Sequence, residues 1–363
     1  MKIAIVGATG LVGQMFLKVL EEEGIAADYY LFASAKSSGK KISFMGAEQK
    51  IIELTPVNIK KARPDFALFS AGSEISKQFA PLFTALGCIV IDNSSAFRRD
   101  ADVPLVVLEC NPEDVNPTPS AAQRRPPLPA KGIIIANPNC STIGAVVALK
   151  PLEDLYKIKR IVYSTYQAVS GAGQAGVDDY RLGMNASVSG KLTTPKKFQH
   201  QIISNVIPHI DSFLPNGNTK EEEKMIFETR KILHRPDLAV SATTVRVPVE
   251  NCHSISINVE FYRKPNLEEI KNALAKAPGV VLCDNPQNNE YPMPILANGR
   301  NEVFVGRIRF DESCENCVNL FTVSDNIRKG AATNAVQILE LLGGSKLTSP
   351  TIQKPSDKSF QKI

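Results

Sequence analysis

The sequence lacks the features that mark membrane, secreted and nucleic-acid-binding proteins. Its 363 residues contain no apolar run of the roughly 18 residues that a membrane-spanning helix needs, and the N-terminus leads into a strand-like segment without a secretory signal. Lysine and arginine (42) exceed aspartate and glutamate (37) only slightly, with no long run of one sign. Such diffuse charge indicates no nucleic-acid or membrane partner. We therefore expect a cytoplasmic protein of enzyme size.

The sequence has only 4 histidines, and its 7 cysteines are an odd number. Of the seven cysteines, most lie in apolar strand-like runs, so we expect free thiols in a reducing cytosol. Cys314 and Cys317 have a metal-like spacing, but no second Cys or His pair accompanies them. We interpret CENC as a hairpin turn and predict no metal site.

Strand and helix patterns alternate through the first third of the chain. A β-branched run at 2–7 is followed by apolar residues at helical spacing that end at Gly24. Further buried strands are predicted at 29–32, 66–70, 88–91, 103–108 and 132–135, with a helix at 73–86. Runs that are apolar on both faces and separated by helices indicate a doubly wound parallel sheet.

The pattern changes after Cys140. Longer strands are predicted at 160–169, 240–249, 254–261, 303–310 and 318–323. Within them Ile255, Ile257, Val259 and Phe261 alternate with polar neighbours, which indicates an antiparallel sheet with one face toward solvent or a partner. The apolar stripe of 330–342 predicts a helix that returns to pack on the first sheet.

The predicted fold class is α/β with two domains, as the chain length also suggests. Residues 1–139 form a Rossmann-like nucleotide-binding domain, which a C-terminal helix at 328–345 completes. Residues 140–327 form an α+β domain with a mainly antiparallel sheet, and 346–363 are a polar tail. The stretch 116–131 holds five prolines and is expected to be an extended surface loop.

The segment GATGLVG joins the first strand to the first helix. Its G-x-x-G-x-x-G spacing is a variant of the dinucleotide fingerprint, in which the N–H groups of a helix N-terminus attract a phosphate. A simple glycine turn is the alternative, but the position directly after the first strand favours nucleotide binding. The expected contacts are Gly7, Thr9, Gly10, Leu11, Val12 and Gly13.

The end of the second strand indicates which nucleotide is bound. NAD-binding enzymes usually carry an Asp or Glu there for the ribose 2′-hydroxyl. Here Ser34, Lys36 and Ser37 provide hydrogen-bond donors and a cation instead. We therefore predict NADP in preference to NAD.

Cys140 lies in IANPNCSTIG, between a turn and a predicted helix. Ser141 and Thr142 could cap that helix, whose dipole would favour a reactive thiolate. A small buried residue in a strand-to-helix turn is the alternative. The position at the carboxyl end of a strand favours function, since open α/β sheets bind ligands there. His253, in an expected polar turn, and Arg246, seven residues before it, are candidate partners.

The chain resembles the aspartate-β-semialdehyde dehydrogenase family over nearly its whole length. NPNCST followed at this spacing by YQAVSGAG is the most specific signal. The resemblance rests on GATGLVG (7–13), DNSSAFR (92–98), NPNCST (137–142), TYQAVSGAG (165–173), NVIPHID (205–211), EEEKM (221–225), VRVPVENCHS (245–254) and VSDNIRKGAATNAVQI (323–338). It implies a fold similar to that of glyceraldehyde-3-phosphate dehydrogenase and a homodimer or homotetramer.

The resemblance also implies a reaction. Cys140 would attack the aldehyde, NADP would accept the hydride, and inorganic phosphate would cleave the thioester to give β-aspartyl phosphate. Cells usually run this reaction backward, toward lysine, threonine, methionine and diaminopimelate. By the same resemblance Gln167 orients the substrate, and His253 is the general acid/base, which suits an imidazole that titrates near neutral pH.

The substrate contacts implied by the resemblance are charged. Arg246 would hold the α-carboxylate and Glu221 the amino group, while Lys224, Arg98 and Asn139 would bind phosphate. The alternatives are solvated charge pairs, i,i+3 within a helix for Glu221 and Lys224. The nicotinamide end of NADP would contact Ala71, Gly72, Ser170, Gly171, Gly173 and Asn326.

Two rival functions stay open from the sequence alone. One is a related acyl-phosphate reductase, which would not need Glu221 and Arg246 as an opposed charge pair for a free amino group and α-carboxylate. The other is a non-catalytic NADP-binding protein, which would not need Cys140, Gln167 and His253.

Overall fold

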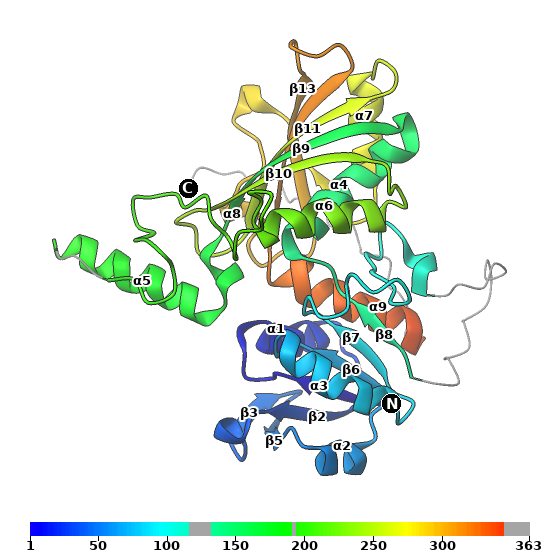
Figure 1. Cartoon of the computed structure of the whole chain (residues 1–363), viewed down its shortest axis with the longest axis vertical. Helices are drawn as coiled ribbons and strands as arrows, with labels where there is room; N and C mark the ends of the chain where they lie inside the picture. The colour runs from blue at the N-terminus through cyan, green and yellow to red at the C-terminus, as the bar shows by residue number, and fades with distance from the viewer. Residues whose placement is uncertain (116–131, 191–193, 345–363) are drawn as a thin grey trace. The chain divides into compact units, whose positions relative to one another are not determined.

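The computed structural model describes residues 1–115, 132–190 and 194–344 (Figure 1). These residues form two compact units, one with Met1–Asn139 and the chain from Ala331, the other with Cys140–Gly330. The predicted proline-rich loop at 116–131 and the polar tail at 346–363 lie outside the described residues.

The first unit contains a six-stranded sheet in which every neighbouring pair is parallel. The strand order is β5-β2-β1-β6-β7-β8. The strands are β1 (Lys2–Val6), β2 (Asp28–Ala33), β5 (Ile52–Glu53), β6 (Phe66–Phe69), β7 (Ile89–Asp92) and β8 (Ile134–Ala136). The chain reverses its direction of winding at β1, which confirms the predicted doubly wound sheet.

Helices pack on both faces of this sheet, which explains why its strands are apolar throughout. One hydrophobic core joins the sheet to α1 (Leu11–Glu22) and α9 (Asn334–Gly343). The other core joins it to α2 (Pro56–Ala62) and α3 (Ser73–Thr84). The apolar stripe predicted at 330–342 therefore does return to the first sheet, and a π-helical turn at Arg328–Thr333 precedes it.

One predicted strand of the first unit is wrong. Residues 103–108 are apolar and 105–107 are buried, but the segment pairs with β8 only through the isolated bridge between Leu105 and Ala136. Pro104 has no N–H group to continue the ladder. The sequence analysis also missed the hairpin of β3 (Lys41–Phe44) and β4 (Ala47–Lys50), whose strands are mostly polar.

The second unit contains a six-stranded mixed sheet in the order β10-β9-β11-β14-β13-β12. Its strands are β9 (Ile158–Gln167), β10 (Ala239–Arg246), β11 (His253–Phe261), β12 (Val280–Leu282), β13 (Val303–Phe310) and β14 (Cys317–Ser324). The three inner pairs are antiparallel, as predicted, whereas β10 and β12 join their neighbours in parallel.

Helices cover one face of the second sheet. The helices of this unit are α4 (Cys140–Tyr156), α5 (Gln174–Val188), α6 (Lys220–Ile232), α7 (Leu267–Lys276) and α8 (Pro294–Ala297). Of these, α4, α6 and α7 cover that face, and the short α8 packs on β14. The alternating residues of β11 confirm the predicted two-faced strand, because Ile255, Ile257 and Val259 are buried while Ser256 and Asn258 are half-buried.

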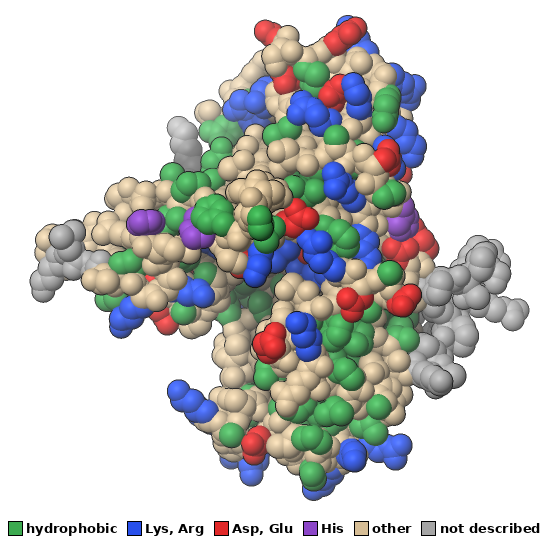
Figure 2. Space-filling view, viewed as in Figure 1, with side chains coloured by type: hydrophobic (Ala, Val, Ile, Leu, Met, Phe, Trp, Pro, Cys, Tyr) green, Lys and Arg blue, Asp and Glu red, His purple; other side chains and the backbone are tan. Residues whose placement is uncertain are grey.

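The surface matches an ordinary globular protein. Lys and Arg side chains are interspersed with Asp and Glu over the face drawn in Figure 2. Within the described ranges, no helix combines the length and hydropathy that crossing a bilayer requires.

Candidate active site

The glycine-rich loop at 7–13 brings the N-terminus of α1 close to the end of β1. Gly7 has a φ of 90° and donates its N–H to the carbonyl of Phe32 at 2.9 Å. A Cβ atom at Gly13 would collide with the carbonyl oxygen of Gly7, so only glycine permits this close approach. Thr9, Gly10, Leu11 and Val12 are all partly exposed on this loop, which suits contact with a ligand.

The other predicted cofactor residues of the first unit lie on neighbouring strand ends. A Cβ atom at Gly7 would lie 2.5 Å from the carbonyl oxygen of Ser70, so the loop with Ala71 and Gly72 borders the glycine-rich loop. The chain after β2, which pairs with β1, exposes Ser34 and Lys36 and half-buries Ser37. Residues 32–41 contain no acidic side chain. The three loops therefore share the carboxyl edge of one parallel sheet.

Arg98 is held by the backbone. Its Nε donates to the carbonyl of Asn137 at 2.9 Å, and its Nη2 donates to the carbonyl of Asn93 at 3.0 Å. The residue is buried, unlike the exposed Arg99. The interpretation of Arg98 as half of a solvated pair is therefore wrong. Asn139 is buried in the same unit, two residues after Asn137.

Cys140 is the first residue of α4, and its Sγ lies 3.1 Å from Nε2 of His253. A Cβ atom at Gly330 would lie 2.8 Å from the Cβ of Cys140, so only glycine lets the chain pack this closely on the cysteine. Ser141 and Thr142 lie within the first turn instead of capping it, which corrects that expectation. The dipole of this helix of 17 residues still favours negative charge on the sulfur.

His253 is the first residue of β11 and is fully buried, not part of the polar turn expected from the sequence. Its Nδ1 accepts the backbone N–H of Ala168 at 3.0 Å. A neutral imidazole with Nδ1 as acceptor carries its proton on Nε2, which faces the sulfur of Cys140. An N–H group directed at the sulfur stabilises a thiolate.

The expectation that His253 titrates near neutral pH is also wrong. Burial, followed by the positive charge of Arg246, lowers the pKa of His253 well below its ordinary value. Both effects disfavour the imidazolium. The imidazole of the folded protein is therefore neutral at pH 7, with an N–H group on Nε2 that can donate a hydrogen bond.

The low pKa of His253 predicts acid sensitivity of the fold. Below about pH 6.5 the unfolded histidine binds a proton and the folded one does not. As the pH falls from there toward the lower pKa of the folded state, the free energy of unfolding therefore decreases by up to about 1.4 kcal/mol per pH unit. Urea unfolding between about pH 5 and 7.5 measures this slope. We expect a shallower slope for His253→Gln, and equal slopes in the two proteins would contradict the assignment.

Gln167 and Arg246 end two neighbouring strands. They are register partners in the parallel pair of β9 and β10. Nη1 of Arg246 donates to the carbonyl of Ala168 at 2.6 Å, and the Arg246 side chain is buried. Ala168 thus binds His253 through its N–H and Arg246 through its carbonyl, so one peptide segment positions both side chains.

Glu221 and Lys224 extend this group of residues from α6. Gln167 Nε2 donates to Glu221 Oε1 at 3.3 Å, and Lys224 Nζ lies 3.2 Å from Glu221 Oε2. Lys224 also donates to Asp211 at 2.9 Å. The i,i+3 pair does form, but Glu221 is buried, so the interpretation of a solvated helix face is wrong. Buried charges of both signs therefore lie along one side of the site.

The predicted nicotinamide residues of the second unit are also near this group. Ser170 Oγ accepts from the side-chain amide of Asn326 at 2.9 Å. A Cβ atom at Gly171 would lie 2.8 Å from Arg246 Nη1 and 3.0 Å from His253 Cε1. Gly173, with a φ of 76°, begins α5. Gly171 therefore packs directly against the imidazole and the guanidinium, where a larger residue would collide with both.

Asp179 is a residue that the sequence analysis missed. Its buried carboxylate accepts the backbone N–H groups of Lys196, Lys197 and Phe198, at distances between 2.6 and 3.2 Å. These bonds lower its pKa against the opposing effect of burial. The ring of Phe198 lies 6.0 Å from the guanidinium carbon of Arg246. Asp179 therefore anchors a segment that lies against Arg246. The sequence analysis could not find it, because no local sequence pattern indicates hydrogen bonds between residues 17 to 19 positions apart.

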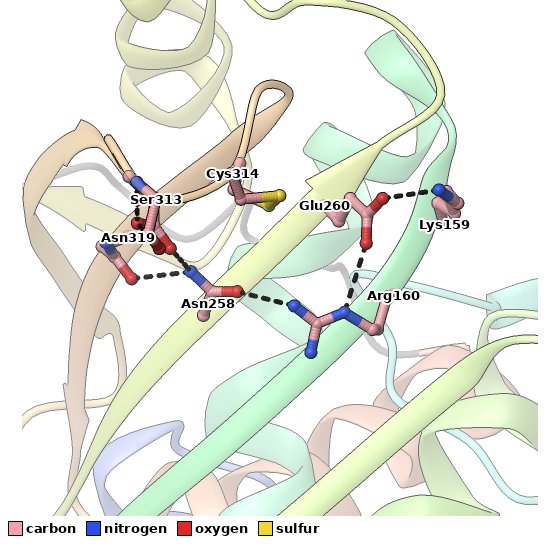
Figure 3. The surroundings of a disulfide bond; sticks show 9 residues. Lys159, Arg160, Asn258, Glu260, Ser313, Cys314 and Asn319 are labelled. Atoms are coloured by element: carbon pink, nitrogen blue, oxygen red, sulfur yellow. Dashed lines mark hydrogen bonds and ion pairs between the residues drawn. A yellow bond between two sulfur atoms is a disulfide. The ribbon is translucent and has the colours of Figure 1, made fainter.

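The CENC segment is a hairpin turn between β13 and β14, as predicted. The expectation of free thiols throughout is wrong, because Cys314 and Cys317 are joined by a disulfide (Figure 3). The turn brings the two ends of the four-residue segment together, with Cα atoms 5.3 Å apart. Cys88, Cys110, Cys140, Cys252 and Cys283 are not joined in disulfides.

Comparison with protein-family models and known proteins gives consistent matches. The model "Semialdehyde dehydrogenase, NAD binding domain" matches residues 2–117, and "Semialdehyde dehydrogenase, dimerisation domain" matches 149–329. Aspartate-semialdehyde dehydrogenase of Aquifex aeolicus is 54% identical, with 94% of this chain and 97% of the relative covered. The enzyme of Campylobacter jejuni is 46% identical, with 93% and 96% covered.

Solved structures agree with these matches. Aspartate semialdehyde dehydrogenase II of Vibrio cholerae, complexed with ASA, gives a TM-score of 0.86 at 41% identity, with 95% of this chain and 98% of that chain covered. The Candida albicans enzyme with NADP gives a TM-score of 0.72 at 28% identity, with 94% and 98% covered.

Proposed function

Because this chain belongs to the aspartate-semialdehyde dehydrogenase family, we propose that it catalyses the reversible, NADPH-dependent reductive dephosphorylation of β-aspartyl phosphate to aspartate semialdehyde. The resemblance and the fold class inferred from the sequence are thereby confirmed. The observation that carries the proposal is the contact of 3.1 Å between Cys140 Sγ and His253 Nε2 at the start of α4. The reaction serves the biosynthesis of lysine, threonine, methionine and diaminopimelate.

Cys140 is the nucleophile in this proposal. Its thiolate attacks the acyl carbon of β-aspartyl phosphate, the C–O bond to phosphate breaks, and a thioester forms. Bound NADPH supplies a hydride for the reduction of the acyl carbon. The Nε2–H of His253 donates a hydrogen bond to the oxyanion of the resulting thiohemiacetal, which collapses to release the aldehyde and the Cys140 thiolate. A neutral imidazole with Nε2–H suits this step.

Charged residues hold the substrate. Arg246 offers a planar fork for the α-carboxylate, and Glu221 accepts the ammonium group. Lys224, Arg98 and Asn139 bind the phosphate that leaves or enters, while Gln167 orients the acyl group. Opposite charges on Arg246 and Glu221 suit a free amino acid. This arrangement disfavours the rival substrates N-acetylglutamyl phosphate and glyceraldehyde 3-phosphate, which lack the free amino group.

The loops at the carboxyl edge of the first sheet fit NADP. Gly7 and Gly13 let the loop pack tightly between β1 and α1, and the exposed Gly10 precedes the N-terminus of α1, where a pyrophosphate would bind. Lys36 and Ser34 are exposed where an NAD enzyme would offer a carboxylate. In this proposal residues 1–139 with the helix of 328–345 are the NADP-binding domain, and 140–327 are the catalytic and dimerisation domain.

We also propose a homodimer, or a homotetramer built from it, that works in the cytoplasm. The face of the second sheet opposite α4, α6 and α7 carries Tyr166, which is 43% exposed and lies beside Phe321. An apolar pair on a sheet face suits contact with a second copy.

The proposed function is tested by assaying the full-length chain with aspartate semialdehyde, inorganic phosphate and NADP. Glyceraldehyde 3-phosphate and N-acetylglutamate semialdehyde serve as competing substrates, and we expect kcat/KM for them to be lower by about 10⁴-fold, because they leave a buried charge unpaired. NADP should bind more tightly than NAD. A rival substrate of equal kcat/KM, or a lower dissociation constant for NAD, would contradict the proposal.

The role of Asp179 gives a further prediction. Asp179→Asn replaces an acceptor oxygen by an N–H donor and loosens the segment with Phe198, so Arg246 is held less firmly. Because a hydrogen bond to a charged group contributes about 1.5–3 kcal/mol, we expect KM for aspartate semialdehyde to rise by about tenfold or more. Since no reacting atom is touched, kcat should change much less.

A matched control for Asp179 is the neighbouring residue. Asp178 is exposed, so Asp178→Asn makes the same change of charge without loss of the backbone bonds. We expect a wild-type KM for this variant. If the two variants gave the same KM, Asp179 would have no role in holding Arg246.

A further inference from the structure

The hairpin between β13 and β14 places two sulfur atoms beside a carboxylate. Cys317, at the start of β14, is the register partner of Glu260 near the end of β11. A carboxylate oxygen of Glu260 and the Sγ atoms of Cys314 and Cys317 all lie within 4.8 Å of one another. Figure 3 shows the sulfur of Cys314 directed toward Glu260. Cys314 is half-buried and Cys317 is buried.

The carboxylate of Glu260 is held ionised by two cations. Lys159 Nζ lies 2.6 Å from Oε1, and Arg160 Nε lies 3.2 Å from Oε2. Asn258 and Asp311 continue the polar network on the same sheet face. Glu260 is thus fixed in position, and its carboxylate is already ionised and able to bind a cation.

We propose that this hairpin is a redox-gated site for a thiophilic divalent cation such as Zn²⁺. In the oxidised state the sulfur atoms are bonded to each other and supply no thiolate. A dithiol reductant transfers two electrons and two protons, the S–S bond breaks, and two thiols form. The cation then displaces the two thiol protons and is bound by Cys314, Cys317 and Glu260, with a water molecule in the fourth position of a tetrahedral site.

Charge and access support this assignment. Two thiolates and a carboxylate carry three negative charges, one more than the cation neutralises. Lys159 and Arg160, which are paired with Glu260, offset this remaining negative charge. The partly exposed Cys314 gives a reductant access to the disulfide. Zn²⁺ prefers thiolate ligands to the oxygen ligands that suit Mg²⁺ or Ca²⁺.

The site is separate from the catalytic pair. Glu260 and His253 lie seven residues apart on the same strand, which corresponds to about 23 Å at roughly 3.3 Å per residue. Metal binding at the hairpin therefore does not depend on the proposed dehydrogenase reaction, and its test does not need enzyme activity.

Cd²⁺ is a suitable probe because its bonds to thiolates absorb in the ultraviolet. The full-length Cys140→Ser chain is used, so that the thiol beside His253 adds no signal. We expect the reduced protein to bind one Cd²⁺ per chain with thiolate absorbance, and Zn²⁺ to displace it. The same protein with its disulfide intact should not bind. Absence of uptake by the reduced protein, or equal uptake in both redox states, would overturn the proposal.

Matched variants identify the ligands. We expect Cys314→Ser to weaken binding by about 100-fold or more, since loss of even an outer partner of a metal site costs about 10- to 100-fold. Glu260→Gln should weaken binding by at least about tenfold. Glu315→Gln removes an exposed carboxylate of the same hairpin and should leave affinity unchanged. Equal affinity of Glu260→Gln and Glu315→Gln would exclude Glu260 as a ligand.

Discussion

Cys140→Ser should abolish phosphate-dependent formation of NADPH from aspartate semialdehyde, with kcat lower by about 10⁴-fold or more. A serine hydroxyl in this position is not ionised near neutral pH, and loss of a covalent nucleophile normally costs several orders of magnitude. The change from sulfur to oxygen keeps the shape of the side chain and the start of α4, so we expect the fold to persist. Steady-state kinetics with both substrates saturating measures the effect.

Cofactor binding and a second cysteine serve as controls for Cys140→Ser. The variant should bind NADP with wild-type affinity, because the predicted contacts of the adenine nucleotide are in the glycine-rich loop. Cys314→Ser makes the same substitution at a half-buried cysteine of the hairpin, where it breaks the disulfide with Cys317, and it should retain wild-type kcat. Residual activity of Cys140→Ser above about one hundredth of normal would contradict a covalent role.

Arg246→Leu should lower kcat/KM for aspartate semialdehyde by about 10²- to 10³-fold, mainly through KM. Removing one partner of a buried charged pair costs about 2–5 kcal/mol. Leucine keeps an apolar side chain of similar length against Phe198 but offers no donor to the α-carboxylate. Measurement of kcat and KM separately tells whether binding or chemistry is lost.

Two further variants sharpen the test of Arg246. Arg246→Lys keeps the charge without the planar fork, so we expect an intermediate loss. Arg181→Leu removes an exposed arginine paired with Glu250 and should leave kcat/KM unchanged. If Arg246→Leu retained the wild-type KM, the α-carboxylate would be bound elsewhere.

The sequence predicted those parts of the fold that depend on local burial. Runs apolar on both faces correctly indicated the strands of the parallel sheet, and alternation in β11 correctly indicated a sheet with one covered face. The segment 103–108 failed because its apolar residues fill the core without extended pairing, which Pro104 prevents. β3 and β4 were missed because a polar edge hairpin has no apolar pattern.

The residues of the site could be named from motifs, but their physical state could not. Cys140 and His253 are 113 residues apart, and only the pairing of β9, β10 and β11 places Ala168 and Arg246 beside the imidazole. Burial and a neighbouring cation then lower the pKa of His253, which no local sequence feature signals. Asp179 and the Cys314–Cys317 bond likewise depend on contacts that the turns of the folded chain create.

Trapping of the acyl-enzyme tests the central claim, the thioester on Cys140, most directly. The full-length chain is mixed with β-aspartyl phosphate without NADPH, quenched with acid and digested, and the peptides are weighed by mass spectrometry. We predict an aspartyl adduct on the peptide with Cys140, which disappears when NADPH is added and is absent from Cys140→Ser. An adduct on another residue, or turnover without any adduct, would contradict the account.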